Sequence, residues 1–170
     1  KLFAGVDGNL LYPNLPAAEY AALKALAAHD IAPRPLALLN TKAGEVLIYR
    51  HLAGACWSES TAPVARLLRR LHRIKPDLPL RKLPAGPAAL RRSIKAILSA
   101  CETVPAAFAR LPDLPTALPP AKEALLHTDV VPGNIIVTEN GLRLIDWQCP
   151  AIGDPCEDLA SFLSPAMQFL

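Results

Sequence analysis

The chain has 170 residues, of which 52% are hydrophobic and 19% are charged. This composition excludes a disordered chain, because disordered chains carry too few apolar residues to bury a core. The net charge of +3 is too small to indicate nucleic acid as a partner. No apolar run approaches the roughly 20 residues of a membrane-spanning helix. We therefore expect one globular domain or two small lobes, with no membrane and no nucleic acid as partners.

Four cysteines stand at positions 56, 101, 149 and 156. No pair has C-x-x-C spacing and no His lies at ligand spacing from them, so we expect no zinc site. We interpret them as reduced thiols of a cytoplasmic protein, with a Cys149–Cys156 disulfide as the less favoured alternative. The chain begins at Lys1 and stops inside an apolar run, so we expect a fragment of a longer protein.

The first 53 residues combine helix and strand signals. Pro16 opens an Ala-rich segment, which predicts a helix to about Ala28 because Pro is favoured in the first turn. Short runs at 35–39 and 45–49 predict two strands joined by a turn at 42–44. Gly54 marks a boundary, and the pattern after it is helical. We therefore expect an N-terminal part, residues 1–53, and a second part, residues 54–170.

Two helices are predicted in the second part by apolar residues at helical spacing. The first apolar stripe comprises Val64, Leu67, Leu68, Leu71 and Ile74, and the second comprises Leu90, Ile94, Ile97, Leu98 and Cys101. Basic residues of the same helices are interpreted as solvated faces. These are Arg66, Arg69, Arg70, Arg73, Arg91, Arg92 and Lys95.

Residues 135–138 and 142–145 are short, β-branched and separated by Glu-Asn-Gly, which predicts a hairpin. A two-residue turn would pair residues whose numbers sum to 281, and a three-residue turn would pair residues summing to 280. Only the second register places Asn134 opposite Asp146 on the same face. In either register the ends of the hairpin bring the two side chains into one neighbourhood.

A carboxylate and an amide oxygen at the mouth of a hairpin suit a hard cation that keeps several waters, namely Mg²⁺. Asp129 stands five residues before Asn134, on the loop that enters the hairpin. A carboxylate there can accept a proton from a substrate hydroxyl while Mg²⁺ neutralises a phosphate. The segment therefore predicts phosphoryl-transfer chemistry.

His127, Asp129 and Asn134 form the pattern H-x-D-x-x-x-x-N, and Ile-Asp-Trp follows at 145–147. Gly-Asp-Pro at 153–155 and Asp-Leu-Ala at 158–160 continue it. This segment resembles the choline/ethanolamine kinase and aminoglycoside phosphotransferase family, the small-molecule relatives of protein kinases. The resemblance implies an α+β, bilobal, protein-kinase-like fold that is incomplete at both ends. Residues 1–53 would be an N-lobe remnant with a small antiparallel sheet, and 54–170 a mainly helical C-lobe with a catalytic β-hairpin.

The resemblance also implies the roles of individual residues. Asp129 would be the catalytic residue, and Asn134 and Asp146 would bind Mg²⁺. Lys1 would contact the ATP phosphates and Glu19 would pair with it, although a terminal Lys is commonly just solvated. Tyr49 and His51 lie in the 47–52 stretch, whose backbone would meet the adenine, and His127 would hold the loop by hydrogen bonds. Asp154 and Asp158 would cap a helix and brace the loop, with substrate contact as the less favoured alternative.

The leading hypothesis is an ATP- and Mg²⁺-dependent phosphotransferase acting on a small-molecule alcohol, with choline-, ethanolamine- or thiamine-like acceptors preferred. An aminoglycoside acceptor is the alternative within the enzymes. A nucleotide-binding pseudokinase module is the alternative outside them, and the intact residues 129, 134 and 146 speak against it. A third hypothesis is a Pro-rich interaction scaffold, because the chain has 18 prolines, but these form no PxxP repeats in a polar context.

Overall fold

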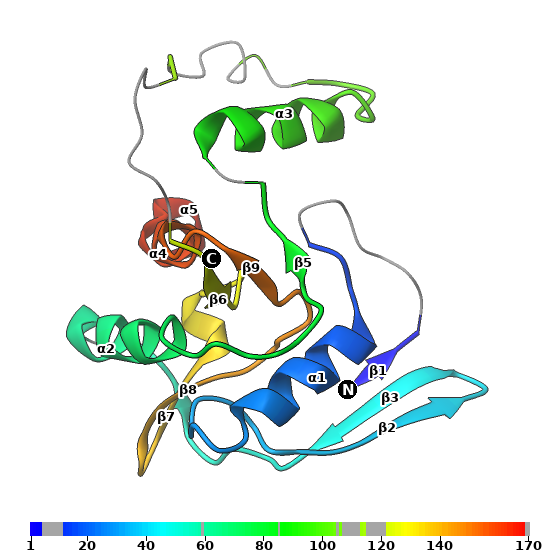
Figure 1. Cartoon of the computed structure of the whole chain (residues 1–170), viewed down its shortest axis with the longest axis vertical. Coiled ribbons are helices and arrows are strands. Elements are labelled where there is room, and N and C mark those ends of the chain that lie inside the picture. The colour runs from blue at the N-terminus through cyan, green and yellow to red at the C-terminus, as the bar shows by residue number, and fades with distance from the viewer. Residues whose placement is uncertain are drawn as a thin grey trace.

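The computed structural model describes residues 1–4, 12–58, 60–84, 86–104, 106, 113–114 and 122–168. Among these residues the strands form three small sheets of three strands each (Figure 1). Helices α1, α2, α4 and α5 lie around the sheets, whereas α3 stands apart from the rest of the molecule. No helix in this described part is long and apolar enough to cross a membrane.

The first sheet has the order β1-β3-β2 and is antiparallel throughout. Its strands are β1 (Leu2–Phe3), β2 (Pro35–Thr41) and β3 (Gly44–Tyr49). Helix α1 (Pro16–Leu26) begins at the predicted proline, ends two residues earlier than predicted, and buries Ala22, Leu23 and Leu26. At the β2–β3 turn, Gly44 has φ +124°, and a Cβ there would meet the carbonyl oxygen of Phe3 at 2.2 Å. The turn therefore requires glycine.

The other two sheets lie in the second part of the chain. One has the order β4-β7-β8 and the other β5-β9-β6, in which β5 runs parallel to β9. Their bounds are β4 (Ala55–Cys56), β5 (Arg81–Lys82), β6 (Ala124–Leu126), β7 (Ile135–Thr138), β8 (Gly141–Leu144) and β9 (Ala151–Gly153). A 3₁₀ turn, Pro132–Asn134, precedes β7.

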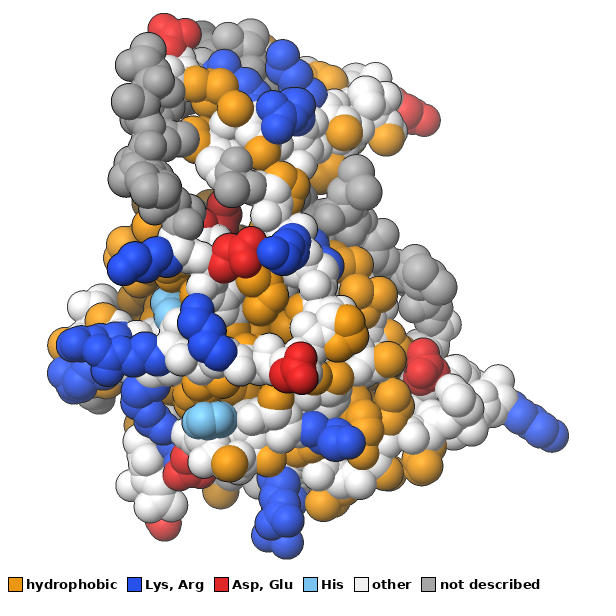
Figure 2. All heavy atoms as spheres, viewed as in Figure 1, with side chains coloured by type: hydrophobic (Ala, Val, Ile, Leu, Met, Phe, Trp, Pro, Cys, Tyr) orange, Lys and Arg blue, Asp and Glu red, His pale blue; other side chains and the backbone are white. Residues whose placement is uncertain are grey.

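Helix α2 (Thr61–Leu71) confirms the first apolar stripe, because Val64, Leu67, Leu68 and Leu71 are buried. Its basic residues are exposed as predicted, and Figure 2 shows them gathered on the surface over this helix. Helix α3 (Pro87–Leu98) is also present, but Ala89 is its buried residue and Leu90 is 38% exposed. The second stripe therefore predicts the helix correctly, but among the described residues its apolar side chains do not pack into a core. Helices α4 (Cys156–Leu163) and α5 (Pro165–Gln168) end the described chain.

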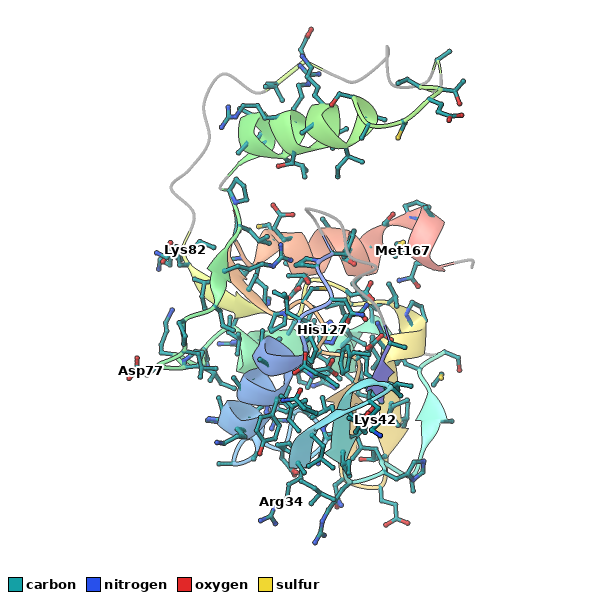
Figure 3. The ribbon with its side chains drawn as sticks, turned by 90° about the vertical axis from the view of Figure 1, so that its right-hand side faces the viewer. Arg34, Lys42, Asp77, Lys82, His127 and Met167 are labelled. Atoms are coloured by element: carbon teal, nitrogen blue, oxygen red, sulfur yellow. The ribbon has the colours of Figure 1, made fainter. Side chains whose placement is uncertain are left out.

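One hydrophobic core joins the first sheet to the second part of the chain. Phe3, Leu23 and Leu47 belong to it together with Leu68 and Trp147. The junction also contains a backbone hydrogen bond, from the Leu144 N–H to the Ile31 oxygen at 2.7 Å. Figure 3 shows His127 in the interior of this body, whereas Arg34 and Asp77 lie at its periphery. The four cysteines are free thiols, as expected.

The hairpin is present, but both expected registers are wrong. Thr138 pairs with Gly141 and Ile135 with Leu144, so paired residue numbers sum to 279. The loop contains the two residues 139 and 140, because Gly141 at φ +99° enters the strand as its first residue. The Thr138 hydroxyl fixes this turn by donating to the Gly141 oxygen at 2.7 Å. Consequently Asn134 lies beside Ile145 rather than opposite Asp146. The Ile145 N–H donates to the backbone oxygen of Asn134 at 2.9 Å.

Candidate functional site

The loop that carries the predicted catalytic motif leaves β6 at His127 and re-enters regular structure at β7. Its second residue, Thr128, has φ +72°, a conformation that is costly for a β-branched side chain. The Thr128 hydroxyl donates to the Cys149 oxygen at 2.8 Å. The surrounding structure therefore determines this backbone conformation and, with it, the position of Asp129.

Asp158 of α4 is the main support of the loop. Its carboxylate is fully buried and accepts the Thr128 N–H at 2.8 Å and the His127 N–H at 3.1 Å. The ring of His72, just after α2, donates to the same carboxylate at 2.9 Å. Asp158 thus connects α2, α4 and the loop, and the expected bracing role is confirmed. Asp154 accepts the Cys156 N–H at 2.9 Å and caps the start of α4, also as expected.

His127 holds the loop from its other side. One ring nitrogen, Nε2, bonds the Ile145 oxygen at 2.8 Å, and the other, Nδ1, accepts the Asp129 N–H at 3.3 Å. A carbonyl can only accept and an N–H can only donate, so the ring is the neutral Nε2–H tautomer. Burial lowers the pKa of His127, and the charge of Asp158 offsets this only in part. The Trp147 ring packs edge-on against it, with 4.5 Å between ring centroids.

Asp129 and Asn134 contact each other directly. The Asn134 amide donates to a carboxylate oxygen of Asp129 at 2.9 Å and to its backbone oxygen at 3.0 Å. Both residues are partly exposed. Because the NH₂ group of Asn134 is used in this way, its side-chain oxygen remains to coordinate a cation.

A second group of charged side chains surrounds Asp146. This residue follows β8 and Ile145 with φ +61°, and Lys1 forms ion pairs with it and with Glu19, the latter at 2.9 Å. Glu19 is 1% exposed, and this burial raises its pKa despite the opposing effect of Lys1. Burial lowers the pKa of Lys1, but the hydrogen bonds to Asp146 and Glu19 outweigh it and the net shift is upward. The expected Lys1–Glu19 pair is therefore present, and the same Lys1 amine also pairs with Asp146.

The two predicted nucleotide contacts at 49 and 51 lie in different surroundings. Burial raises the pKa of Tyr49, and Glu19 and Asp146 raise it further, so its hydroxyl lies near the charged group around Lys1. His51 is exposed and lines a separate groove that contains none of the residues 1, 19, 129, 134 or 146. The structure thus brings Tyr49, but not the His51 side chain, towards the predicted site.

The two clusters adjoin each other through the backbone. Asn134 bonds Ile145, the residue before Asp146, and His127 bonds the same Ile145 at its oxygen. The described residues contain no group of three or more His, Cys, Asp or Glu side chains that could hold a metal. One carboxylate and one amide oxygen nevertheless fit Mg²⁺, which usually keeps several waters and shares its ligands with substrate phosphates.

A cavity of about 290 Å³ opens beside the loop at Thr128, the residue before Asp129. It is lined by Thr128, by Tyr12 and Arg81, by Leu90 of α3, and by α4 and α5 residues that include Glu157. Burial raises the pKa of Tyr12, and the charge of Asp129 raises it further. Burial also raises the pKa of Glu157.

Several residues of the site were missed or undervalued by the sequence reasoning. His72, which bonds Asp158 at 2.9 Å, is not among the predicted site residues; its place at the end of the α2 stripe was the available signal. Gln148, whose oxygen lies 3.5 Å from the Lys1 amine, follows the Ile-Asp-Trp motif directly. Tyr12 had no signal, because its approach to the loop depends on tertiary structure.

Comparisons with known proteins identify a family and a fold. The model of the phosphotransferase enzyme family matches residues 11–169. None of the curated proteins matches the chain. Among solved structures, a choline/ethanolamine kinase family protein from Mesorhizobium loti has 20% identity and a TM-score of 0.61, covering 89% of this chain and 55% of that one.

Two further structures represent other acceptors. The aminoglycoside phosphotransferase APH(3'')-Id from Streptomyces rimosus has 20% identity and a TM-score of 0.57, over 88% of this chain and 65% of that one. Amicoumacin kinase hAmiN, in complex with AMP-PNP, Ca²⁺ and Ami, has 14% identity and a TM-score of 0.51, over 91% and 53%. The chain thus spans less than two thirds of the length of each. The expected α+β, protein-kinase-like fold class is confirmed.

Proposed function

Because the chain belongs to the phosphotransferase enzyme family, we propose that it takes part in transferring the γ-phosphoryl group of ATP to a hydroxyl of a small molecule. The observation that supports this most strongly is the position of Asp129. It lies on a braced loop, bonded to Asn134 at 2.9 Å, and the preceding residue, Thr128, lines a cavity large enough for a small acceptor.

In this proposal Asp129 orients the acceptor hydroxyl and takes its proton as the oxygen attacks. The hydrogen bond from Asn134 holds the carboxylate in place. Lys1, kept protonated by its raised pKa, contacts the nucleotide phosphates, and buried Glu19 fixes the direction of the Lys1 side chain. Tyr49 and the backbone of the 47–52 stretch are assigned to the nucleotide side, whereas the His51 side chain lines a separate groove.

Asn134 and Asp146 are the residues that would hold Mg²⁺. When bound, the cation supplies positive charge that neutralises the phosphate oxygens and orients them for in-line transfer. Asp146 is 35% exposed at its side chain, so water ligands can reach it. The loop between β8 and β9 presents it beside the Lys1 amine, which covers one of its oxygens.

For the acceptor, we propose a small amino alcohol of the choline, ethanolamine or thiamine-like type. The cavity of about 290 Å³ offers the aromatic ring of Tyr12 and the carboxylate of Glu157, two groups that attract an ammonium ion. The other charged lining residue, Arg81, donates to the Cys149 oxygen at 3.3 Å. An aminoglycoside is the second candidate, but its several amines need more than the one carboxylate found among the described lining residues.

The test is the substitution Asp129→Asn in the full-length protein, with Asp77→Asn as the matched control because Asp77 is exposed and distant from the site. Turnover with a panel of amino alcohols and aminoglycosides is followed as ADP release. We expect kcat of Asp129→Asn to fall by about 10²–10⁴-fold while nucleotide affinity is unchanged. Wild-type turnover in this variant would contradict the role of Asp129. Nucleotide binding without turnover in the wild type would support a pseudokinase module instead.

A further inference from the structure

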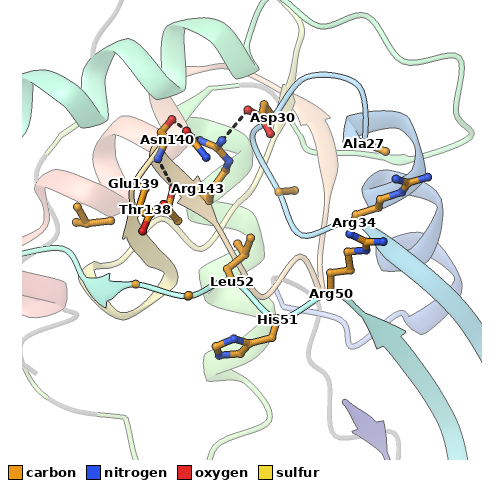
Figure 4. Close-up of a pocket in the computed structure, with 14 residues that line it drawn as sticks. Ala27, Asp30, Arg34, Arg50, His51, Leu52, Thr138, Glu139, Asn140 and Arg143 are labelled. Carbon is orange, nitrogen blue, oxygen red and sulfur yellow. Dashed lines mark hydrogen bonds and ion pairs between the residues drawn. The ribbon is translucent and has the colours of Figure 1, made fainter.

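A second and larger cavity lies away from the catalytic loop. It has a volume of about 740 Å³ and is formed by the α1–β2 connection, the segment 50–54 after β3, and the tip of the β7–β8 hairpin (Figure 4). None of the residues 1, 19, 129, 134 or 146 lines it. We call this cavity the rear groove.

Two arginines stand side by side at one end of the rear groove. The Arg50 N–H donates to the Arg34 oxygen at 2.9 Å, so the two residues are neighbours across adjacent chain segments. Figure 4 shows both side chains at this end of the groove. Both residues are exposed, and no carboxylate among the described residues pairs with either. Like charges at such positions repel each other, and a bound anion would remove this cost.

The third arginine of the groove is already neutralised. Arg143 has a side chain that is 6% exposed, and it forms an ion pair with Asp30 at 2.7 Å. It also donates to the backbone oxygens of Asn140 at 3.2 Å and Leu142 at 3.1 Å. The Arg143–Asp30 pair therefore builds the far wall of the groove. Arg34 and Arg50 carry two further positive charges against the one carboxylate of Glu139, so the lining keeps a net positive charge.

The rest of the lining is mixed. Ala27, Ala32, Leu52 and Val137 contribute hydrocarbon surface, and Val137 is 43% exposed. Polar surface comes from Thr138 and Asn140 and from the Glu139 carboxylate at the hairpin tip. Small-molecule sites commonly measure about 300–1,000 Å³ and combine apolar surface with a few polar groups. The volume is much larger than a free phosphate ion needs, so the groove suits an anionic group attached to an organic body.

We propose that the rear groove binds a small organic phosphomonoester, whose phosphate lies between Arg34 and Arg50 and whose organic part lies on the apolar wall. Two guanidinium forks match the three oxygens of a terminal phosphate and its double charge. The site is separate from the one that carries the proposed phosphoryl transfer. A ligand there contacts both the first sheet and the hairpin that follows the catalytic loop.

The test measures binding to the full-length protein by calorimetry without divalent cations, at low and high salt. The probes are glucose 6-phosphate, a sugar ester, and glycerol 3-phosphate, a polyol ester, with glucose and glycerol as controls that lack the phosphate. We expect at least one ester to bind and its parent alcohol not to bind at this site. The affinity should fall with salt because the contact is ionic.

Variants locate the site. Arg34→Gln and Arg50→Gln should each weaken binding by about tenfold or more, and the double variant by about a hundredfold. Arg66→Gln, an exposed arginine of α2 outside the groove, and Asp129→Asn should leave binding unchanged. Hydrogen exchange of the hairpin tip, residues 138–140, should slow with ligand. No ester binding, unchanged affinity in the double variant, or loss of binding in Asp129→Asn would each overturn the proposal.

Discussion

The support of the catalytic loop by Asp158 predicts a large effect for a nearly isosteric substitution. In Asp158→Asn one carboxylate oxygen becomes an NH₂ group. In the wild type, the Thr128 N–H donates to one carboxylate oxygen, and the His127 N–H and the His72 ring donate to the other. The single oxygen that remains in the variant can therefore accept either from Thr128 or from the two histidines, but not from both. At least one buried backbone N–H then faces a donor instead of an acceptor.

The magnitude follows from these contacts. A hydrogen bond to a charged group contributes about 1.5–3 kcal/mol, and a buried donor left unsatisfied costs about 1–3 kcal/mol. We therefore expect the free energy of unfolding of Asp158→Asn to fall by about 2–4 kcal/mol in urea denaturation. We also expect kcat to fall more than nucleotide affinity, because Thr128 positions Asp129.

Asp154→Asn is the matched control, since Asp154 accepts one N–H at an exposed position. Its free energy of unfolding should change by less than about 1 kcal/mol. The reasoning is refuted if Asp158→Asn unfolds at the same urea concentration as the wild type, with the same dependence of the free energy on urea. The three donors would then not need the carboxylate as their acceptor.

Three further predictions concern the core and its ionisation. Burial lowers the pKa of His127, so below pH ~6.5 the unfolded chain binds a proton that the folded chain does not. The free energy of unfolding should therefore decrease as the pH is lowered through this range, by at most ~1.4 kcal/mol per pH unit. His127→Gln should flatten that slope in thermal unfolding. Gly54→Ala should destabilise by roughly 1–3 kcal/mol in urea, because its Cβ would lie 2.2 Å from the Val137 oxygen; wild-type stability would contradict this. Leu68→Ala, at 1% exposure, should cost ~2–5 kcal/mol, whereas Leu90→Ala on α3 should cost under ~1 kcal/mol, and equal losses would contradict the placement of α3.

The sequence predicted those parts of the fold that depend on local pattern. Pro16 and the following apolar positions determine α1, and the stripe of α2 identifies its buried face. The motif residues 127, 129 and 134 fall on one loop because their spacing in the chain is short. Asp158 was expected to brace the loop, since its neighbours in the sequence resemble the family's continuation of the motif.

The errors arise where tertiary structure or one hydrogen bond decides. The hairpin register depends on the Thr138 hydroxyl and on Gly141 entering the strand, and neither effect is visible in the alternation of residues. Strands of two or three residues, such as β4 and β5, have no periodicity to detect. The apolar stripe of α3 predicts a helix but cannot say what packs against it.

The central claim is that Asn134 and Asp146 hold the metal that accompanies the nucleotide. Mn²⁺ can replace Mg²⁺ as a paramagnetic probe, and its binding to the full-length protein with AMP-PNP can be followed by electron paramagnetic resonance. We expect nucleotide-dependent Mn²⁺ binding in the wild type and in Asp154→Asn, and at least about tenfold weaker binding in Asp146→Asn. Mn²⁺ affinity in Asp146→Asn equal to that of the wild type, or no nucleotide-dependent Mn²⁺ binding in the wild type, would contradict the claim.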